Sequence, residues 1–360
     1  MTRTTRTTRT TRTTGTTGTT GTTALGTTAL GTNGPISSLQ GLGCMGMSDF
    51  YVGAAPDRAE SSATLAYALD LGVTHFDTSD MYGTGANEEL LGEFFRGGRR
   101  DEVLLATKFG IDRHAAPGGR DIRGDAAYVR SACDASLARL GVDTIDLYYM
   151  HRRDTAVPIE ETVGAMAELV AAGKVRHLGL SEVTAKEIRA AAAVHPIAAV
   201  QAEWSLFARD IEDSVVPAAR EVGAAVVPYS PLGRGFLSAL WTSFEDLPDG
   251  DTRRAQPRFT GDNAKNNAEL LRPLKDIAQA RGVTPAQVAL AWIQMRGDVW
   301  AMPVVPIPGT TKRARLAENA AAVGIVLDDA ELAALEPIGA QVSGDRYAVM
   351  THTYVGPGRE

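Results

Sequence analysis

The sequence predicts an α/β fold in which parallel strands close into a (β/α)8 TIM barrel. Two observations lead to this prediction: short apolar runs alternate with segments of helical periodicity, and the alternation supplies eight strands. A third is that reactive polar residues stand where several of these runs end, which is where parallel barrels place their chemistry. The 360 residues are enough for one such barrel, which takes roughly 250.

The expected elements follow one another in a regular order. The strands lie in the segments GLGCMGM, HFDT, VLLATK, IDLYYM, VRHLGL, AAVQ, AAVVPY and VVPIPG. The helices cover residues 57–71, 87–95, 126–140, 159–171, 185–194, 215–222, 268–281, 285–295 and 312–322. One helix follows each strand, except that the seventh strand is followed by a longer insertion and two helices.

Residues at the helix ends support these boundaries. Thr284 precedes Pro285, and Gln287 stands three residues after Thr284, which predicts a capping box. Asp57 likewise precedes a helical run that carries Glu60. A doubly wound sheet would instead require a glycine-rich fingerprint that opens directly into a helix, and no helix opens directly from GLGCMG.

Composition excludes several classes of protein. The chain is 44% hydrophobic and 22% charged, with a net charge of −7, so neither nucleic acid nor an acidic membrane is a favoured partner. Its two cysteines, Cys44 and Cys133, form no CxxC motif, so neither a disulfide framework nor a metal site is expected. No apolar run approaches the roughly 20 residues that span a bilayer. We therefore expect a cytoplasmic protein.

The N-terminal stretch has a different composition from the rest. Residues 1–28 are almost entirely Thr, Arg and Gly, with no acidic residue and little to bury, which predicts a disordered extension. A targeting segment, or a surface or nucleic-acid contact through its four arginines, is the alternative. The barrel is expected over residues 29–345, and residues 346–360 form a C-terminal tail.

Four residues at expected strand ends form a candidate catalytic site: Asp77, Tyr82, Lys108 and His151. Hydride addition to a carbonyl leaves an alkoxide that needs a proton, and a lysine beside a phenol lowers the phenol's pKa from about 10. Tyr82 would then be the general acid in reduction and the general base in oxidation. Asp77 would hold Lys108 charged, and His151 would orient the carbonyl. Taken singly, Asp77 could be a cap, Tyr82 a turn residue and His151 an ordinary surface residue.

Several longer motifs then occur in a fixed order: FDTSDMYG with NEELLGE, TKFG, LYYMH, GKVRHLGLSE, YSPLGRGFL and IPGTTKRARLAEN. Together they resemble the aldo-keto reductase family over about residues 29–347. GLGCMGMS and DTRRAQPRF are similar to its bacterial and plant branch. The resemblance implies an oxidoreductase that uses NADPH to reduce an aldehyde or ketone to an alcohol, with the four residues above as its catalytic tetrad.

The resemblance also implies a site for the nicotinamide and the pyrophosphate. Ser181 and Gln201 would hydrogen-bond the carboxamide, and Tyr229 would stack on the nicotinamide ring. The loop over the pyrophosphate would comprise Ser230, Pro231, Leu232, Gly233 and Arg234. Glu182 stands where the family often has Asn.

The segment IPGTTKRARLAEN would bind the adenosine part. Its residues in this role are Gly309, Thr310, Thr311, Lys312, Arg313, Arg315, Glu318 and Asn319. The threonines lead into a helix N-terminus, where anions are favoured, and the cations would contact the 2′-phosphate of NADP+. Glu318 and Asn319 would read the adenine. Many relatives have Lys where this chain has Gly309, so the preference for NADPH is expected to be moderate, and NADH remains possible.

The motifs do not identify the substrate. Loops 112–124 and 237–263 and the tail after residue 343 should surround the pocket, with Phe50, Tyr51, Phe109 and Trp204 as candidate lining groups. Such aromatic residues suit an apolar aldehyde or ketone. Two alternatives remain open: a redox-sensing regulatory subunit of the same fold, and an alcohol dehydrogenase that works with NAD.

Overall fold

The computed structural model describes residues 25–48, 57–113, 121–240, 245 and 247–355. Its central sheet has parallel strands in the spatial order β11-β10-β9-β8-β5-β4-β3, wrapped into a nearly closed barrel. These strands are β3 (Leu42–Gly43), β4 (His75–Asp77), β5 (Leu104–Phe109), β8 (Ile145–Met150), β9 (Val175–Ser181), β10 (Ile197–Glu203) and β11 (Ala225–Tyr229). The predicted (β/α)8 fold is confirmed.

The eighth position of the barrel is occupied by residues 303–309, the segment in which a strand was expected. It bridges β11 through Val226 and Val304 and bridges β3 through Gly43 and Gly309, both in parallel orientation. The bonds that hold it are Val305 N to Val226 O and Ile307 N to Pro228 O on one side, and Gly41 N to Pro306 O on the other, each 3.0 Å long. The segment contains three prolines, which lack an N–H, so a regular ladder is interrupted.

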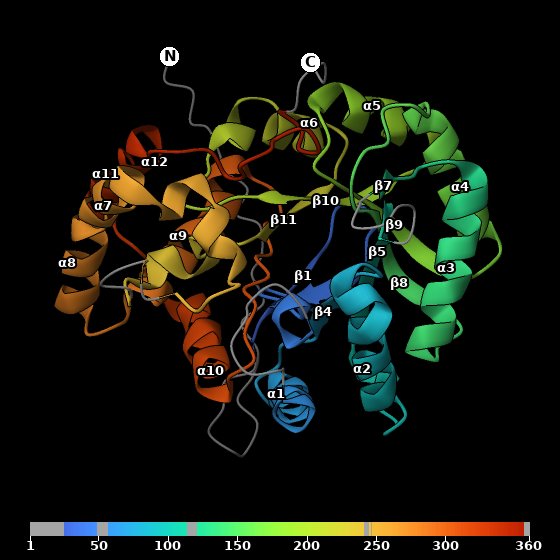
Figure 1. Cartoon of the computed structure of the whole chain (residues 1–360), viewed down its shortest axis with the longest axis horizontal. Coiled ribbons are helices and arrows are strands. Elements are labelled where there is room, and N and C mark those ends of the chain that lie inside the picture. The colour runs from blue at the N-terminus through green and yellow to red at the C-terminus, as the bar shows by residue number, and fades with distance from the viewer. Residues whose placement is uncertain (1–24, 49–56, 114–120, 241–244, 246, 356–360) are drawn as a thin grey trace, which may run out of the picture.

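Helices surround the strands (Figure 1). They are α1 (Arg58–Asp70), α2 (Ala86–Phe95), α3 (Ala126–Leu140), α4 (Ile159–Ala171), α5 (Ala185–Val194), α6 (Val215–Glu221), α9 (Pro285–Trp300) and α10 (Arg313–Ala321). The insertion and C-terminal region add α7 (Gly261–Glu269), α8 (Arg272–Arg281), α11 (Asp329–Leu335) and α12 (Ile338–Gln341). The caps are those expected: Asp57 accepts from Glu60 N, and Thr284 and Gln287 form a capping box.

One predicted helix is divided in the structure. Residues 268–281 were expected to form a single helix, but α7 ends at Glu269 and α8 begins at Arg272. Pro273 stands in the first turn of α8. Because proline has no backbone donor and its ring clashes with the preceding turn, it is tolerated at a helix start and not in a helix interior. The expected helix 285–295 continues to Trp300.

The boundary of the N-terminal extension also differs from the prediction. Thr27 and Thr28 were included in the expected disordered extension, but they lie in β1 (Thr27–Ala29), which pairs antiparallel with β2 (Ile36–Ser38). Leu30 follows this strand and is fully buried in the barrel interior. Gly31 has a φ of +74°, and a Cβ there would lie 2.6 Å from Gly223 O, so the turn requires glycine. Residues 1–24 lie outside the described part of the chain.

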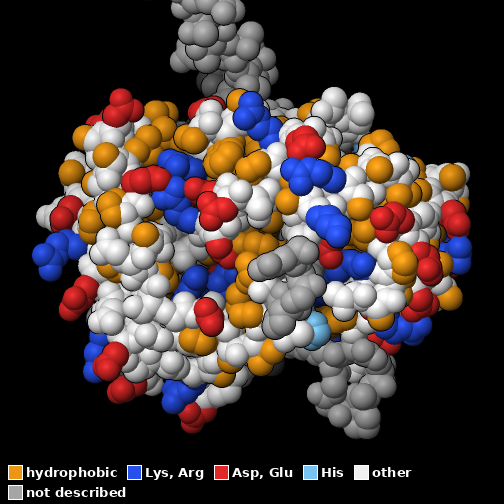
Figure 2. All heavy atoms as spheres, turned by 90° about the horizontal axis from the view of Figure 1, so that it is seen from above, with side chains coloured by type: hydrophobic (Ala, Val, Ile, Leu, Met, Phe, Trp, Pro, Cys, Tyr) orange, Lys and Arg blue, Asp and Glu red, His pale blue; other side chains and the backbone are white. Residues whose placement is uncertain are grey.

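Two large apolar clusters and a small one around Tyr82 form the core of the described residues. One fills the barrel interior and includes Leu104, Leu147, Tyr149, Val227 and Ile307. The other lies between the strands and the helices. On the outside, acidic and basic side chains are interspersed with apolar ones on the face that Figure 2 shows. Within the described residues, no helix is long and apolar enough to cross a membrane.

Candidate active site

The four predicted catalytic residues meet at one end of the barrel. Asp77 is the last residue of β4, Lys108 lies near the end of β5, and His151 directly follows β8. Tyr82 begins a 3-10 turn, η2 (Tyr82–Gly85), which β4 leads into. All four side chains are buried. Because parallel strands run in the same direction, residues at their C-terminal ends come together although they are far apart in the chain.

Lys108 is the centre of this group. Its Nζ donates to Asp77 Oδ1 at 2.5 Å, to the Thr78 carbonyl at 2.8 Å and to the Tyr82 hydroxyl at 3.3 Å. An ammonium group has three donors, so each has an acceptor here. A fully buried charge is tolerated only when it is paired and hydrogen-bonded in this way.

The environment sets the protonation of Lys108 and Tyr82. Burial would lower the pKa of Lys108, but Asp77 and Tyr82 raise it above its ordinary value, so the ammonium stays charged. Burial raises the pKa of Tyr82, and Lys108 lowers it. Lys108 therefore acts in the expected direction, but the net shift for Tyr82 is upward because burial is the larger cause. The phenol is therefore neutral, and keeps its proton, at neutral pH.

His151 is oriented by a residue that the motif analysis did not single out. Its Nδ1 lies 3.0 Å from the Oγ of Ser79, and its ring meets the Tyr82 ring edge-on, with centroids 5.9 Å apart. Ser79 Oγ also lies 3.2 Å from Asp80 Oδ1. Burial and the nearby Glu88 raise the pKa of Asp80 well above its ordinary value. The position of Ser79 between Asp77 and Tyr82 in the sequence was the available signal.

Gln201, expected at the nicotinamide carboxamide, is also in contact with the tetrad. Its Nε2 donates to Asp77 Oδ2 at 2.8 Å. Both carboxylate oxygens of Asp77 therefore accept a hydrogen bond, one from Lys108 and one from Gln201. Because β10, which carries Gln201, lies across the barrel from β4, this bond spans the barrel interior.

Glu182, next to the predicted carboxamide ligand Ser181, holds the C-terminal tail. It is fully buried and accepts two hydrogen bonds from Arg346, of 3.1 and 3.2 Å. The Tyr229 hydroxyl donates to it at 2.8 Å and lies 3.1 Å from the Tyr347 hydroxyl. Burial would raise the pKa of Glu182, but Arg346 and Arg152 lower it to about 2. The carboxylate is ionised and saturated with donors.

A model of the Aldo/keto reductase family matches residues 41–340. The chain belongs to this family. The resemblance seen in the motifs is thereby confirmed, and membership supports an oxidoreductase that acts on carbonyl compounds.

Solved structures agree with this aldo/keto reductase assignment. A glycerol dehydrogenase from Gluconobacter oxydans is 27% identical, with a TM-score of 0.77 and coverage of 88% of this chain and 95% of that one. An aldo/keto reductase from Klebsiella pneumoniae, solved with NADP and acetate, is 30% identical, with a TM-score of 0.63 and coverage of 87% and 94%. The holo form of a Bacillus halodurans aldo-keto reductase is 25% identical, with a TM-score of 0.69 and coverage of 93% and 99%.

In this aldo/keto reductase, the loop predicted to cover a pyrophosphate has an unusual backbone. Ser230 and Arg234 have φ values of 48° and 58°. Left-handed backbone costs non-glycine residues roughly 1–2 kcal/mol each and tends to occur at functional sites. Arg234 also donates to Glu203 at 3.0 Å, and its guanidinium lies 4.5 Å from the centre of the Tyr347 ring. Pro231, Leu232 and Gly233 complete the loop.

In this aldo/keto reductase, the segment predicted to bind the adenosine part presents its cations to solvent at the start of α10. Lys312, Arg313 and Arg315 are exposed, and Arg313 is bound by Glu60 through two contacts of 3.2 Å. Thr310 Oγ1 accepts from Lys312 N at 3.0 Å, and Thr311 precedes them.

Other residues of this segment are held by the barrel. Gly309 lies against β3, where a Cβ would come within 3.0 Å of Gly43 O. Glu318 accepts from Thr284 Oγ1 at 2.6 Å, which ties it to the cap of α9, and Asn319 is buried.

Two of the four candidate lining residues of the substrate pocket, Phe109 and Trp204, need correction. Phe50 and Tyr51 lie outside the described part of the chain. Phe109 is fully buried and stacks on Tyr148, with ring centroids 5.0 Å apart, in the layer between strands and helices. Trp204 is buried in the same layer and donates to Glu212 at 2.9 Å. Phe109 points away from the barrel interior because successive strand residues alternate in direction, and Lys108 points inward.

Proposed function

We propose that this aldo/keto reductase uses NADPH to reduce an aldehyde or ketone to an alcohol, with the proton coming from Tyr82. The observation that carries the proposal is the contact of 3.3 Å between Lys108 Nζ and the Tyr82 hydroxyl, with Lys108 itself held 2.5 Å from Asp77. A neutral phenol beside a fixed ammonium group is suited to donate a proton to a developing alkoxide.

Each residue of the tetrad has a separate role in the proposed reaction. Tyr82 gives its proton to the carbonyl oxygen, and the positive charge of Lys108 stabilises the phenolate that remains. Asp77 keeps Lys108 charged and in place. His151, held through Nδ1 by Ser79, orients the carbonyl oxygen toward Tyr82. In the reverse direction the phenolate of Tyr82 would be the general base.

The residues present suit a nicotinamide dinucleotide. The hydroxyl of Ser181 and the ring of Tyr229 lie at the ends of β9 and β11, where the nicotinamide is expected, and the positive-φ loop 230–234 follows directly. Lys312 and Arg315 are exposed at the start of α10, where a 2′-phosphate is expected. When bound, the cofactor supplies the hydride. Because the Glu182 carboxylate is hydrogen-bonded to Arg346, we assign binding of the nicotinamide carboxamide to Ser181 and Gln201.

A second candidate is oxidation of an alcohol with NAD. The observation that favours it is the similarity to a glycerol dehydrogenase, together with Gly309 in place of the usual lysine. The same tetrad would serve, with Tyr82 as the base. A redox-sensing regulatory subunit is the remaining alternative, and a cytoplasmic location stays a prediction from composition.

A panel of aldehydes and ketones with NADPH and with NADH tests these proposals, with consumption of the reduced nicotinamide followed by absorbance. The same panel should be run in reverse with alcohols and NADP+ or NAD+. We expect turnover of at least one carbonyl, faster with NADPH. Turnover only of alcohols with NAD+ would favour the second candidate. Tight NADPH binding without turnover of any substrate would point to a regulatory subunit.

A further inference from the structure

Arg152 is a cation at the mouth of the barrel that has no role in the proposed reaction. It directly follows His151, and its side chain is half-buried. Its guanidinium donates to the His151 carbonyl at 3.0 Å and lies 3.5 Å from Ser181 Oγ. Both contacts are to neutral groups. Within the described part of the chain, Arg152 forms no ion pair with a carboxylate.

Its contacts with His151 and Ser181 place Arg152 beside the predicted reacting centre. Burial would lower the pKa of Arg152, but nearby ionisable groups raise it, so the guanidinium remains charged. These groups are Tyr229, Tyr347, Glu182 and Tyr82. Tyr82 is the proposed proton donor, and Tyr229 is the proposed platform for the nicotinamide. The pKa of Tyr82 itself is set mainly by burial and by Lys108, and Arg152 has the smallest influence on it.

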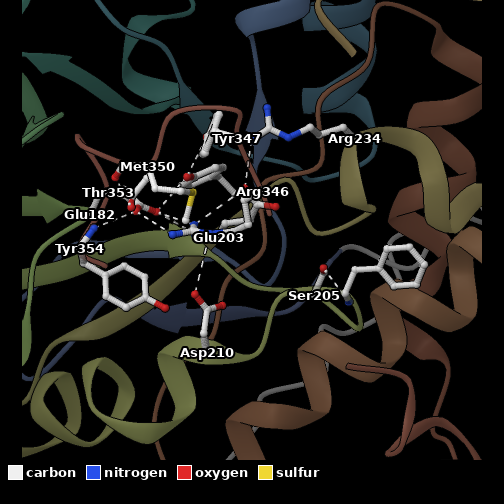
Figure 3. Close-up of polar contacts among 12 residues, drawn as sticks. Glu182, Glu203, Ser205, Asp210, Arg234, Arg346, Tyr347, Met350, Thr353 and Tyr354 are labelled. Carbon is white, nitrogen blue, oxygen red and sulfur yellow. Dashed lines mark hydrogen bonds and ion pairs between the residues drawn. The ribbon is translucent and has the colours of Figure 1, made fainter. Parts of the chain in front are cut away.

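Four other cations among the described residues at the barrel mouth are paired with carboxylates. Lys108 is paired with Asp77 at 2.5 Å, and Arg346 with Glu182 at 3.1 Å. Arg234 and Arg258 lie 3.0 and 3.7 Å from Glu203. These three carboxylates are therefore already balanced by cations other than Arg152. Glu182 in particular is bound by Arg346, as Figure 3 shows. It also accepts hydrogen bonds from Tyr229 and from backbone amides.

We propose that Arg152 is a specificity-determining residue that binds a carboxylate on the carbonyl substrate. This inference rests on the proposed reductase function and narrows its substrates to carbonyl compounds that carry an anionic group. The planar guanidinium matches a carboxylate through two parallel hydrogen bonds, and a half-buried guanidinium that contacts only neutral groups gains most from such a partner. A cofactor phosphate is the competing ligand, but Arg152 contacts Ser181 at the predicted nicotinamide end.

The test compares substrates that differ only in charge. The 2-, 3- and 4-carboxybenzaldehydes and the corresponding formylbenzamides are assayed with NADPH, and kcat/KM is measured for wild type, Arg152→Gln and Arg152→Lys. We expect wild type to favour at least one acid over its amide by about tenfold or more, the scale of one charge-assisted contact. Arg152→Gln should abolish this preference and leave the rate with the amide within about threefold. Arg152→Lys should retain part of it.

The adjacent arginine provides a matched control. Arg153 lies 3.2 Å from Glu187, so Arg153→Gln removes a cation at the next position and should preserve the preference for the acid. The proposal is overturned if wild type favours none of the acids, or if Arg152→Gln slows acid and amide equally. A large loss of NADPH affinity in Arg152→Gln would also overturn it, because the cation would then serve the cofactor.

A binding measurement separates this inference from the proposed reductase activity. Calorimetry with benzoate and benzamide, in the presence of NADP+, needs no turnover. If no aldehyde is reduced but benzoate binds more tightly than benzamide, and Arg152→Gln removes the difference, the reductase function fails and the carboxylate site stands. If wild type binds benzoate no better than benzamide, the carboxylate site fails whether or not the neutral aldehydes are reduced.

Discussion

The mouth of the barrel holds a buried carboxylate on each of two sides, and the two are neutralised differently. On the tetrad side, formed by β4, β5 and β8, Asp77 is paired with Lys108 of the neighbouring strand, 31 residues away. On the tail side, formed by β9, β10 and β11, Glu182 is paired with Arg346 of the C-terminal tail, 164 residues away. The tetrad side places its cation against a phenol that can react. The tail side uses its cation to fix a segment of chain.

A buried ion pair therefore does not by itself indicate a catalytic site. Both carboxylates are almost inaccessible, and both accept several hydrogen bonds. The two cations differ in what else they contact. Lys108 contacts Tyr82, the proposed proton donor, whereas Arg346 contacts acids and an aromatic ring. The two sides should therefore respond to substitution in different ways, one in rate and the other in stability.

The largest effect is expected on the tail side. Glu182→Gln should destabilise the protein by about 3–5 kcal/mol, because it leaves the buried guanidinium of Arg346 without its closest counterion. Denaturant unfolding measures this, and Glu160→Gln, an exposed acid on α4, should change little. A loss below about 1 kcal/mol would show that Glu203 and Asp210, 3.9 and 3.8 Å from Arg346, replace Glu182.

Acid titration sharpens the same point. The pKa of Glu182 is lowered from 4.5 to about 2 in the folded protein, so its stabilisation is complete above about pH 4.5. As the pH falls from 4.5 toward 2, the unfolded state takes up the proton first and this stabilisation is lost. The difference in unfolding free energy between wild type and Glu182→Gln should shrink over that range. A difference that stays constant with pH would contradict the ion-pair explanation.

On the tetrad side, Tyr82→Phe should lower turnover by at least about 100-fold, the scale of losing a positioned general acid. Cofactor affinity should change little, because the phenol acts on the substrate. Tyr67→Phe on α1 is the control for removing a tyrosine hydroxyl elsewhere. Because the pKa of Tyr82 is raised, wild-type reduction should keep its rate through neutral pH and fall only at alkaline pH. Near-normal turnover of Tyr82→Phe would mean that another group supplies the proton.

The variant Ser79→Ala tests how far catalysis depends on the orientation of the His151 imidazole. Loss of the contact of 3.0 Å to His151 Nδ1 should lower kcat/KM by about fivefold to tenfold, since one hydrogen bond no longer fixes the imidazole. Ser61 is also a buried serine, and its hydroxyl has no hydrogen-bond partner in the described residues. The control variant Ser61→Ala should therefore leave kcat/KM unchanged. Equal kinetics for the two variants would show that His151 needs no help from Ser79.

The smallest effect is expected at the exposed cations of α10. Arg315→Ala should raise the Michaelis constant for NADPH by about threefold to tenfold and hardly change that for NADH, because only NADPH carries the 2′-phosphate. Arg313→Ala should do less, since Glu60 already binds Arg313. Equal effects of Arg315→Ala on both cofactors would indicate an adenine or structural role. A wild-type preference for NADH would overturn the phosphate site.

The tetrad and most helices could be predicted because their signals are local. The helices 126–140, 159–171 and 185–194 have the expected ends, since apolar periodicity and capping residues lie within each segment. Asp77, Lys108 and His151 come at or near the ends of recognisable apolar runs, and parallel strands bring such ends together whatever the loops do. The sequence by itself therefore determined the barrel and the meeting of the four reactive groups.

The tertiary structure alone decided which distant segments meet. The partners Glu182 and Arg346 lie 164 residues apart, and Ser79 and His151 lie 72 apart, so no spacing rule links them. The alternation of side chains along β5 directs Phe109 into the layer between strands and helices. The eighth barrel position contains three prolines and forms no regular strand, although its apolar pattern predicted one. The physical reason is that local patterns set periodicity and caps. The path of the tail and the neighbours of a buried charge depend on how the closed barrel packs.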